Sequence, residues 1–589
     1  MRIDAKRYKD QQHYKNHKFF FFGCIIFFVL ILLIRLSFSP QNPLFFPAVF
    51  LITCINFYKT TTSDLKRKEV LLSFVFSVFF GLAISVGSSV HYIHIRAGIS
   101  DNFLRMNLNV LAMGGIVSLV LWPNVVSLAK VDGKLIKRCL KKDHKKHIFW
   151  LAWALILSGW LPYLLSFYPG GIVGDGAITI EEALHEGLPS TNHWVVTYIL
   201  FIRFFLRIAS LLPVSDNQSL HIGIFLYVVF SMLFVSGTCA GVCVRISKHG
   251  FSIWFVWLCI AFYSFSGFFA SHSMSLWKDA TYGAGVVLLS LLLWDIRDTP
   301  KTLFLFTLLS LFLCFWRNNG IYLLLLVLIG LIVLLKSRAY KFIICGMAVV
   351  IITNVVTGPV YSAVGIKNDS LRQSASIPLQ QIAATINSNV ELSQEQKDIL
   401  FIILPEETWR RNYCPALSDD LKNSIDDSVF EEHFRDFLRV WGQLLIPNFK
   451  IYVKAYLMQT LGFWQPFVHR GNYYDYWFGI QDIFSRGYHK IDIWEKITKI
   501  SISENLMNQA DFISSGTIVW ILFLSTVLIL MQPKTGYKRL LPILPLLGSW
   551  VIIMIATPIA YAYRYIFMLP LAFPVLLVLP FEQEKFTES

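Results

Sequence analysis

The sequence predicts an all-α protein that crosses a membrane many times. Hydrophobic residues make up 55% of the 589 residues and charged residues only 15%, whereas a soluble domain carries about 25% charged residues. The apolar runs are continuous and about 16–24 residues long, which suits membrane helices and exceeds the ~10 alternating residues of a barrel strand. This composition excludes a soluble globular enzyme, a disordered chain and a disulfide-rich secreted module.

The net charge of +15 arises from basic residues that lie in the loops, and it does not indicate a nucleic-acid partner. Lys and Arg gather in short stretches between apolar runs, as the positive-inside rule expects of cytoplasmic loops. Residues 1–18 are basic, and the apolar run 19–36 that follows has no small-residue cleavage site. We therefore expect an uncleaved first anchor and a cytoplasmic N-terminus.

The apolar runs define a topology of 14 crossings with both termini cytoplasmic. The basic stretches 66–68 and 134–146 place the loops after the second and fourth spans inside. The fifth span then delivers residues 168–175 to the outer face. The predicted spans are 19–36, 43–58, 70–88, 108–129, 148–167, 221–244, 251–270, 280–296, 302–316, 320–335, 340–361, 517–532, 540–557 and 561–580.

The apolar run 194–212 is predicted to lie along the outer interface and not to cross. A crossing would put all later basic loops on the outer side, against the positive-inside rule. Arg203 and Arg207 are four residues apart on one helical face, and two arginines at mid-depth in a bilayer are costly. We expect an amphipathic interfacial helix that ends at Pro213; a re-entrant segment stays open as the alternative.

These spans divide the chain into six parts. The long polar segment is not a linker, because Phe430, Phe434 and Phe437 recur at helical spacing and predict short helices that rest on the membrane surface. The parts are a basic cytoplasmic N-terminus (1–18), a four-helix membrane block (19–147), a membrane core (148–363) with a first outer loop (168–220), an extracytoplasmic segment (364–516), a three-helix membrane block (517–580) and a cytoplasmic tail (581–589).

The uncommon polar residues gather at the predicted outer ends of spans, so we expect any chemistry there. Asp175 lies in a glycine-rich turn, where a carboxylate can act as a general base or bind a divalent cation. Lys278 and Asp279 begin a later span, and two carboxylates from separate loops suit a base-assisted or metal-assisted transfer. Arg317 and Arg564 can bind phosphate in a bidentate manner. Further candidate substrate contacts are His193, Glu181, Glu182 and Asn319.

Each of these residues also has a plainer interpretation. Asp175 can cap the helix expected to begin near Ile178, and Lys278 can extend along the end of its span to reach water. The two arginines can anchor lipid headgroups, and an interfacial histidine such as His193 is often only a hydrogen-bonded structural group. The residues alone leave these alternatives open.

The order of these motifs resembles the GT-C superfamily of membrane glycosyltransferases. An acidic residue follows a long span in a first outer loop, juxtamembrane helices come next, and a second acidic residue begins a later span. The chain is most similar to an uncharacterised family of polytopic bacterial membrane proteins affiliated with that superfamily. The stretches that carry the resemblance are YPGGIVGDGAI (168–178), NHWVVTYIL (192–200), SMSLWKDATY (273–282), FWRNNGIY (315–322), SIPLQQIAATI (376–386) and YCPALSDDLK (413–422).

The resemblance implies a large helical bundle in the bacterial cell membrane with a substrate cavity that opens outward. It implies a sugar or glycan donor on a polyprenyl phosphate or diphosphate, and an acceptor such as teichoic acid, polysaccharide or a glycolipid. Asp175 is then the first-loop acid and Asp279 the second carboxylate, with Lys278, Arg317 and Arg564 as phosphate contacts. The resemblance raises a divalent cation (Mg²⁺ or Mn²⁺) as a possible cofactor. GT-C enzymes often carry two adjacent acids in this loop, whereas Asp175 is flanked by Gly174 and Gly176.

The sequence leaves two other functions open. A transporter or flippase of a lipid-linked or anionic precursor needs ionisable groups in line across the spans, whereas the polar residues here cluster at outer ends. The second alternative is a catalytically inactive scaffold for envelope assembly. The expected partners are the lipid-linked donor, an envelope glycan or lipid acceptor, and membrane lipids, with no nucleic acid.

Overall fold

The structure is a computed structural model that describes residues 66–91, 108–129, 145–172, 174–466, 490–502, 514–532, 534–560 and 562–582. Within these ranges the chain forms helices and turns, and β-pairing is limited to isolated bridges. The all-α class predicted from composition is therefore confirmed. The first two predicted spans, 19–36 and 43–58, lie outside the described residues.

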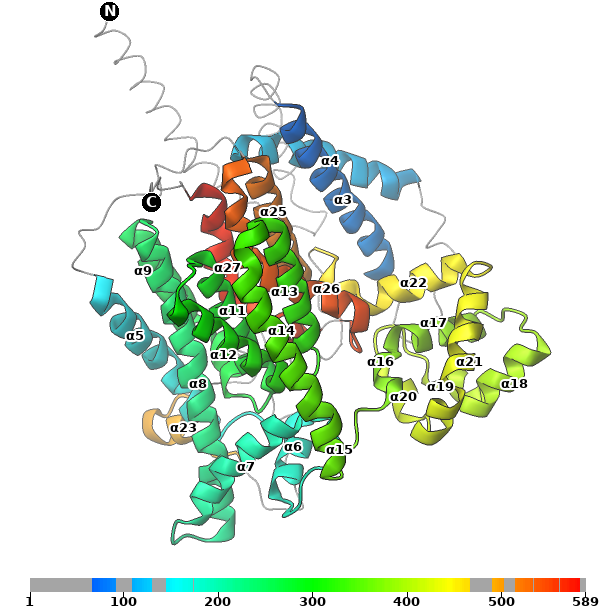
Figure 1. Ribbon diagram of the computed structural model, residues 1–589, viewed down its shortest axis with the longest axis horizontal. Coiled ribbons are helices and arrows are strands. Elements are labelled where there is room, and N and C mark those ends of the chain that lie inside the picture. Colours follow the sequence, from blue (N-terminus) through cyan, green and yellow to red (C-terminus); the bar gives the residue numbers. More distant parts are fainter. Residues whose placement is uncertain are drawn as a thin grey trace, which may run out of the picture.

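The described helices form an elongated bundle and a separate lobe beside it (Figure 1). The bundle contains α3 (Arg67–His91), α4 (Leu108–Ala129), α5 (Lys145–Ser166), α8 (Asp216–Lys248), α9 (Ile253–Phe265), α10 (Gly267–Met274), α11 (Lys278–Trp294), α12 (Pro300–Trp316), α13 (Gly320–Leu335), α14 (Tyr340–Val355), α25 (Ser515–Met531), α26 (Leu544–Ala556) and α27 (Met568–Val578). The lobe contains α16 (Leu371–Ser374), α17 (Ser376–Asn387), α18 (Gln394–Ile403), α19 (Glu406–Asn412), α20 (Asp419–Asn423), α21 (Asp427–Leu445) and α22 (Phe449–Gln459). Three shorter helices lie at one end of the bundle: α6 (Asp175–Leu184), α7 (Val196–Ser210) and α23 (Ile493–Thr498).

Several of the bundle helices are long and apolar enough to cross a membrane. Among the described residues there are five such helices, or six if α9 and α10, which meet at an angle of 55°, form one broken span. Each predicted span within the described residues coincides with a helix or a pair of consecutive helices. The five candidates are Arg67–Gly87, His147–Ser166, Asp216–Lys248, Gly320–Ala363 and Gly536–Ala556.

The longest of these candidates, from α13 to α15 (Tyr361–Ala363), is folded back on itself. The chain turns at a short 3-10 helix, η4 (Lys336–Ala339), where α13 ends. Just before α13, Asn318 is hydrogen-bonded to Asn192, and just after α15, Ile366 packs on Val196. Both ends of the segment therefore lie beside the start of α7, so α13 and α14 run in opposite directions, as two separate predicted spans require.

The core of the bundle lies where α5, α8, α9, α11 and α27 pack together. Two side-chain hydrogen bonds to backbone carbonyls tie its helices together. The indole nitrogen of Trp160 donates to the Tyr263 carbonyl at 2.8 Å, and the Tyr263 hydroxyl donates to the Leu571 carbonyl at 2.5 Å. These contacts join α5 to α9 and α9 to α27.

The predicted amphipathic helix at 194–212 is present as α7, which packs against α8. Arg203 is buried and donates to the carbonyls of Glu182 and Ala183 at 3.0 and 3.1 Å. A cation at the C-terminal end of α6 is favourable, and these hydrogen bonds offset the cost of burying it. Arg207, by contrast, is exposed, so the two arginines predicted to share one face have different surroundings.

The lobe is attached to the bundle at two places by backbone hydrogen bonds. Residues 190–192 pair with Lys367, and residues 416–418 pair with residues 558–560, with N···O distances of 2.9–3.0 Å. The first attachment lies between α6 and α7, and the second lies between α26 and α27. The lobe therefore bridges an early loop and the last loop of the bundle.

The glycine-rich loop before α6 is fixed against the loop between α10 and α11. The Gly171 amide donates to the Met274 carbonyl, and the Leu276 amide donates to the Gly171 carbonyl, both at 2.9 Å. Gly170 lies so close to these residues that a Cβ there would stand 2.5 Å from Val228 Cγ2 and 3.1 Å from the Met274 carbonyl oxygen. The close approach of the two loops requires glycine at this position.

Gly170→Ala is expected to lower the free energy of unfolding by about 1–3 kcal/mol, because the added methyl group crowds Val228 on α8 and the Met274 carbonyl of the neighbouring loop. Thermal unfolding of the purified protein in detergent would measure this. Gly187→Ala is the matched control, since a Cβ at Gly187 meets no atom within 4 Å. Equal stability of the two variants would show that the loop contact is looser than described.

Candidate functional site

Five of the charged residues singled out in the sequence meet at one end of the bundle. They come from four separate segments: the start of α6, the start of α11, the turn between α12 and α13, and the 3-10 helix η9 (Tyr563–Ile566) before α27. The residues are Asp175, Lys278, Asp279, Arg317 and Arg564.

Arg564 lies between the two carboxylates. Its Nη1 is 2.9 Å from Asp175 Oδ2, and its Nε is 3.9 Å from Asp279 Oδ2. On the far side of Asp279, Oδ1 is 3.0 Å from Arg317 Nη1. Carboxylates and guanidinium groups therefore alternate along one row, and the Tyr565 hydroxyl accepts a further hydrogen bond from Arg564 Nη2 at 3.2 Å.

The two carboxylates differ in their access to solvent. The Asp279 side chain is 6% exposed, whereas the Asp175 side chain is 39% exposed. A buried carboxylate needs charged partners to offset its lost hydration, and Arg317 and Arg564 supply them. Asp279 is therefore the buried carboxylate of the site, and Asp175 is the carboxylate that a bound molecule can reach.

Lys278 is the third cation of the site. Its Nζ lies 5.7 Å from the centre of the Trp194 ring, and no carboxylate of the described residues forms an ion pair with it. Among these five residues three cations face two carboxylates, and Lys278 is the cation without an ion pair among the described residues. Burial lowers the pKa of the Lys278 ammonium group, and the charges of Asp279 and Asp175 oppose this. A group of this kind attracts an anion.

Aromatic rings line the cations on several sides. Arg564 Cζ lies 5.1 Å from the centre of the Trp277 ring, and Arg317 Cζ lies 5.1 Å from Tyr565 and 5.6 Å from Tyr282. Such contacts hold guanidinium groups in place. The sequence analysis did not identify these aromatics as site residues, although Trp277 directly precedes Lys278 and Tyr565 directly follows Arg564.

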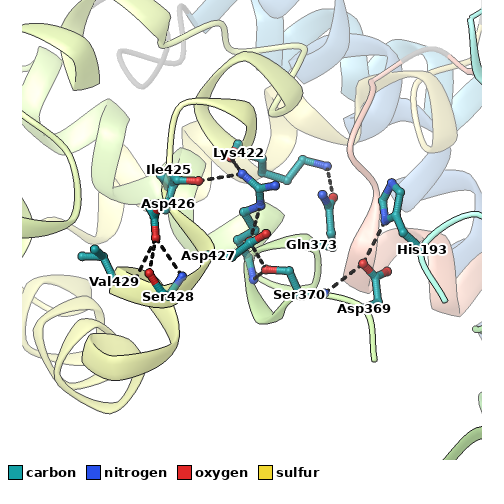
Figure 2. A network of polar contacts seen from close by, with 11 residues as sticks. His193, Asp369, Ser370, Gln373, Lys422, Ile425, Asp426, Asp427, Ser428 and Val429 are labelled. Atoms are coloured by element: carbon teal, nitrogen blue, oxygen red, sulfur yellow. Dashed lines mark hydrogen bonds and ion pairs between the residues drawn. The ribbon is translucent and has the colours of Figure 1, made fainter. Parts of the chain in front are cut away.

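His193 connects the site to the lobe. Its Nδ1 is 2.8 Å from Asp369 Oδ1, and the amide of Ser370 donates to the same oxygen at 2.9 Å (Figure 2). The His193 ring also meets the Trp194 ring edge to face at 4.5 Å. A chain of side-chain contacts thus runs from Asp369 through His193 and Trp194 to Lys278. Asp369 was not found from the sequence, because it is 176 residues away from its partner.

The Asp369 end of this chain of contacts is held by a second polar network (Figure 2). Arg372 Nε lies 2.6 Å from Asp427 Oδ1, and Arg372 Nη1 donates to the carbonyls of Lys422 and Ile425 at 2.7 and 2.6 Å. Ser370 also hydrogen-bonds to Asp427. The segment that carries Asp369 is therefore tied to the end of α20, to the turn that follows it and to the beginning of α21.

The remaining predicted contacts do not join the charged row. Within the described residues, the ion pairs of the site include neither Glu181 nor Glu182, and the carbonyl of Glu182 instead receives Arg203. Asn319 directly precedes α13 without a side-chain capping hydrogen bond, while its neighbour Asn318 donates to the Asn192 carbonyl at 2.9 Å. The asparagine that links α13 to the start of α7 is thus Asn318 and not the predicted Asn319.

The arrangement does not fit a divalent cation held by Asp175 and Asp279. Both carboxylates already face Arg564, and no group of three His, Cys, Asp or Glu side chains among the described residues could hold a metal ion. Carboxylate sites for Mg²⁺ or Mn²⁺ place the ligand oxygens around the metal, where a guanidinium group lies here. We assign no chemical step to a metal.

The charge on Asp175 is stabilised by its neighbours. Burial by itself raises the pKa of Asp175, but the positive charges of Arg564 and Lys278 more than offset this, so its pKa lies below the usual value. Asp175 is therefore ionised at neutral pH. While Arg564 remains paired with it, Asp175 is a weak proton acceptor.

The helical bundle and this charged site define a multi-helix protein with several candidate membrane spans and an anion-attracting cluster at one end. The chain belongs to the DUF6020 family, a family of unknown function, whose model matches residues 189–587. That match includes Lys278, Asp279, Arg317 and Arg564, and Asp175 precedes it. No curated protein and no solved structure matches the chain.

Arg564→Gln is expected to lower the free energy of unfolding by about 3–5 kcal/mol, because it leaves the buried Asp279 with one cation fewer. Chemical unfolding in detergent would measure the loss, with the exposed Arg207→Gln as the matched control. Adding Asp279→Asn to Arg564→Gln should recover part of the stability. A double variant as unstable as the sum of the two single variants would contradict the charge explanation.

The Asp175–Arg564 pair should make stability depend on pH only in acid. Because the folded pKa of Asp175 is lowered, the pair stabilises the fold above the unfolded pKa of about 3.9, and that contribution is lost as pH falls through the folded pKa. The stability difference between the wild type and Asp175→Asn should thus be constant from about pH 5 upward and shrink below about pH 4. A difference that changes near neutral pH would argue against the pair.

Proposed function

We propose that this protein is a membrane glycosyltransferase. It would transfer a sugar or glycan from a polyprenyl phosphate or diphosphate donor to an envelope acceptor at the outer face of the membrane. The observation that carries the proposal is the row Asp175–Arg564–Asp279–Arg317 with Lys278 beside it. It combines an accessible carboxylate with excess positive charge at one end of an apolar bundle.

The three cations suit the phosphate of a lipid-linked donor. A phosphate adds the negative charge that the cluster lacks, and guanidinium groups bind phosphate through two parallel hydrogen bonds. In this proposal Lys278 makes the first contact. Arg317 and Arg564, held by the aromatic rings, then orient the phosphate. Trp194 and Trp277 are half-buried and lie beside Lys278 and Arg564 respectively.

In the proposed reaction, an acceptor hydroxyl oxygen attacks the anomeric carbon of the donor sugar. A new glycosidic bond forms, and the bond between the anomeric carbon and the phosphate oxygen breaks. The electron pair of that bond leaves with the polyprenyl phosphate, whose charge the cations stabilise. The hydroxyl proton passes to Asp175, the carboxylate that solvent reaches.

Because Asp175 is paired with Arg564, binding of the donor would also change the basicity of Asp175. A bound phosphate competes with Asp175 for the Arg564 guanidinium group, because both are anions and the group forms a limited number of hydrogen bonds. When Arg564 moves toward phosphate, Asp175 loses its main stabilising charge and becomes a better base. Donor binding would thus prepare Asp175 for the acceptor.

The proposal includes a GT-C-like fold with 14 crossings, both termini in the cytoplasm and the site on the outer face of a bacterial cell membrane. In this orientation α7 lies along the outer interface. The extracytoplasmic segment (364–516), of which the lobe is part, covers the site and selects the acceptor, which is a glycopolymer such as teichoic acid or polysaccharide, or a glycolipid. Transfer of a whole glycopolymer by a ligase is the variant of the same chemistry.

Asp175→Asn is expected to abolish the function while the protein remains folded. In a deletion strain, wild type should restore the missing envelope glycan and remove an accumulated polyprenyl-linked precursor, and Asp175→Asn should do neither. Lipid extracts analysed by mass spectrometry would identify the precursor. Expression at matched levels and Asp216→Asn, an exposed aspartate at the same end of the bundle, are the controls.

Full rescue by Asp175→Asn would remove the main support for the enzyme. A transporter or flippase would then be the better explanation, and its lipid-linked substrate should accumulate on the inner leaflet in the deletion strain.

A further inference from the structure

The short helix α23 lies against the end of α5, at the end of the bundle that carries the charged site (Figure 1). Asp492 caps its first turn, since Oδ1 accepts from the Glu495 amide at 2.8 Å, and Lys499 ends it with a positive φ of 60°. Beyond this local structure, α23 is fixed to the loop that follows α5. The amide of Ile491 donates to the Tyr168 carbonyl at 2.9 Å.

These contacts set the depth of α23 relative to a membrane. The candidate span of α5, His147–Ser166, ends just before Phe167, and Lys490 Nζ lies 4.0 Å from the centre of the Phe167 ring. Only 28% of the apolar window of that span is buried inside the protein, so most of its surface is left for lipid. A helix attached one or two residues beyond such a span lies at the level of the lipid headgroups.

The side chains of α23 suit a position among the lipid headgroups. Ile497 and Ile500 are 70% and 63% exposed, and they alternate with the exposed Lys496 and Lys499. Trp494 is half-buried. Aliphatic side chains that enter the acyl boundary, lysines that reach phosphates and a tryptophan at the interface are the features of an interfacial membrane anchor.

A shallow hollow of about 440 Å³ lies beside these residues. Its walls carry both charged and apolar groups, as a site for a headgroup with its glycerol backbone requires. The hollow is lined by Lys490, Ile491, Asp492, Glu495, Lys496 and Lys499.

We propose that residues 490–500 form a phospholipid docking site, with a preference for anionic headgroups, that holds the first loop of the charged site at the membrane surface. Ile497 and Ile500 enter the bilayer, and Lys496 and Lys499 bind headgroup phosphates. Because Ile491 is hydrogen-bonded to Tyr168, docking fixes the start of the loop that leads to Asp175. The site does not depend on the proposed enzymatic function.

A protein partner on α23 is the competing occupant. The exposed apolar area is limited to two aliphatic side chains flanked by lysines, whereas the centre of a protein interface is depleted of lysine. The attachment to the end of an apolar helix also places α23 where lipid is always present. Both observations favour the bilayer.

The depth of Ile497 and Ile500 tests the proposal. Nitroxide labels on Ile497→Cys and Ile500→Cys, in a background with the reactive native cysteines replaced by serine, are examined in phospholipid nanodiscs. We expect collisions with oxygen to dominate over collisions with a water-soluble nickel complex. Ile402→Cys is the matched control, because Ile402 is 59% exposed on α18 of the lobe and its label should favour nickel. A label at position 497 that behaves like the one at 402 would overturn docking.

The lysines are tested through the headgroup preference. Quenching of Trp494 by brominated lipid, taken as the difference between the wild type and Trp494→Phe, is compared in phosphatidylglycerol and phosphatidylcholine. The wild type should prefer phosphatidylglycerol, and Lys496→Gln and Lys499→Gln should each reduce that preference about fivefold. Equal quenching by both lipids in the wild type would overturn the anionic preference, and no quenching by either would overturn docking itself.

Discussion

The guanidinium group of Arg564 is the constraint on which the charged end of this protein depends. It lies between Asp175, on the loop that begins α6, and Asp279, at the start of α11. Asp279 is almost fully buried and its charge must be offset, so the last loop of the bundle has to lie against two earlier loops. The same requirement fixes Arg317, the second partner of Asp279.

The lobe reinforces this arrangement from outside. Its backbone pairs with residues 190–192 at one attachment and with residues 558–560 at the other, and His193 adds a side-chain contact to Asp369. Residues 558–560 precede Arg564 by only a few positions. A lobe with its own apolar core is therefore joined to two distant loops. One leads to Trp194, which contacts Lys278, and the other leads to Arg564.

The sequence predicted the helices well, because helix formation in an apolar chain follows from local composition and periodicity. The predicted spans within the described residues fall on helices, and the helix predicted at 194–212 appears as α7. It also predicted that Asp175, Lys278, Asp279, Arg317 and Arg564 belong to one end of the bundle, because each follows or precedes an apolar run. It did not predict the contacts of Asp369 or Asn318, whose partners are more than a hundred residues away.

The sequence by itself thus determined the helical class, the segments that become helices and the end of the bundle where charge collects. Only the tertiary structure decided that Arg564 separates the two carboxylates, that Lys278 is the cation without a paired carboxylate among the described residues, and that aromatic rings hold the arginines. The physical reason is the range of the forces involved. Hydrophobic patterning acts along the chain and can be read from neighbours, whereas ion pairing depends on which loops the packed helices bring within a few ångströms.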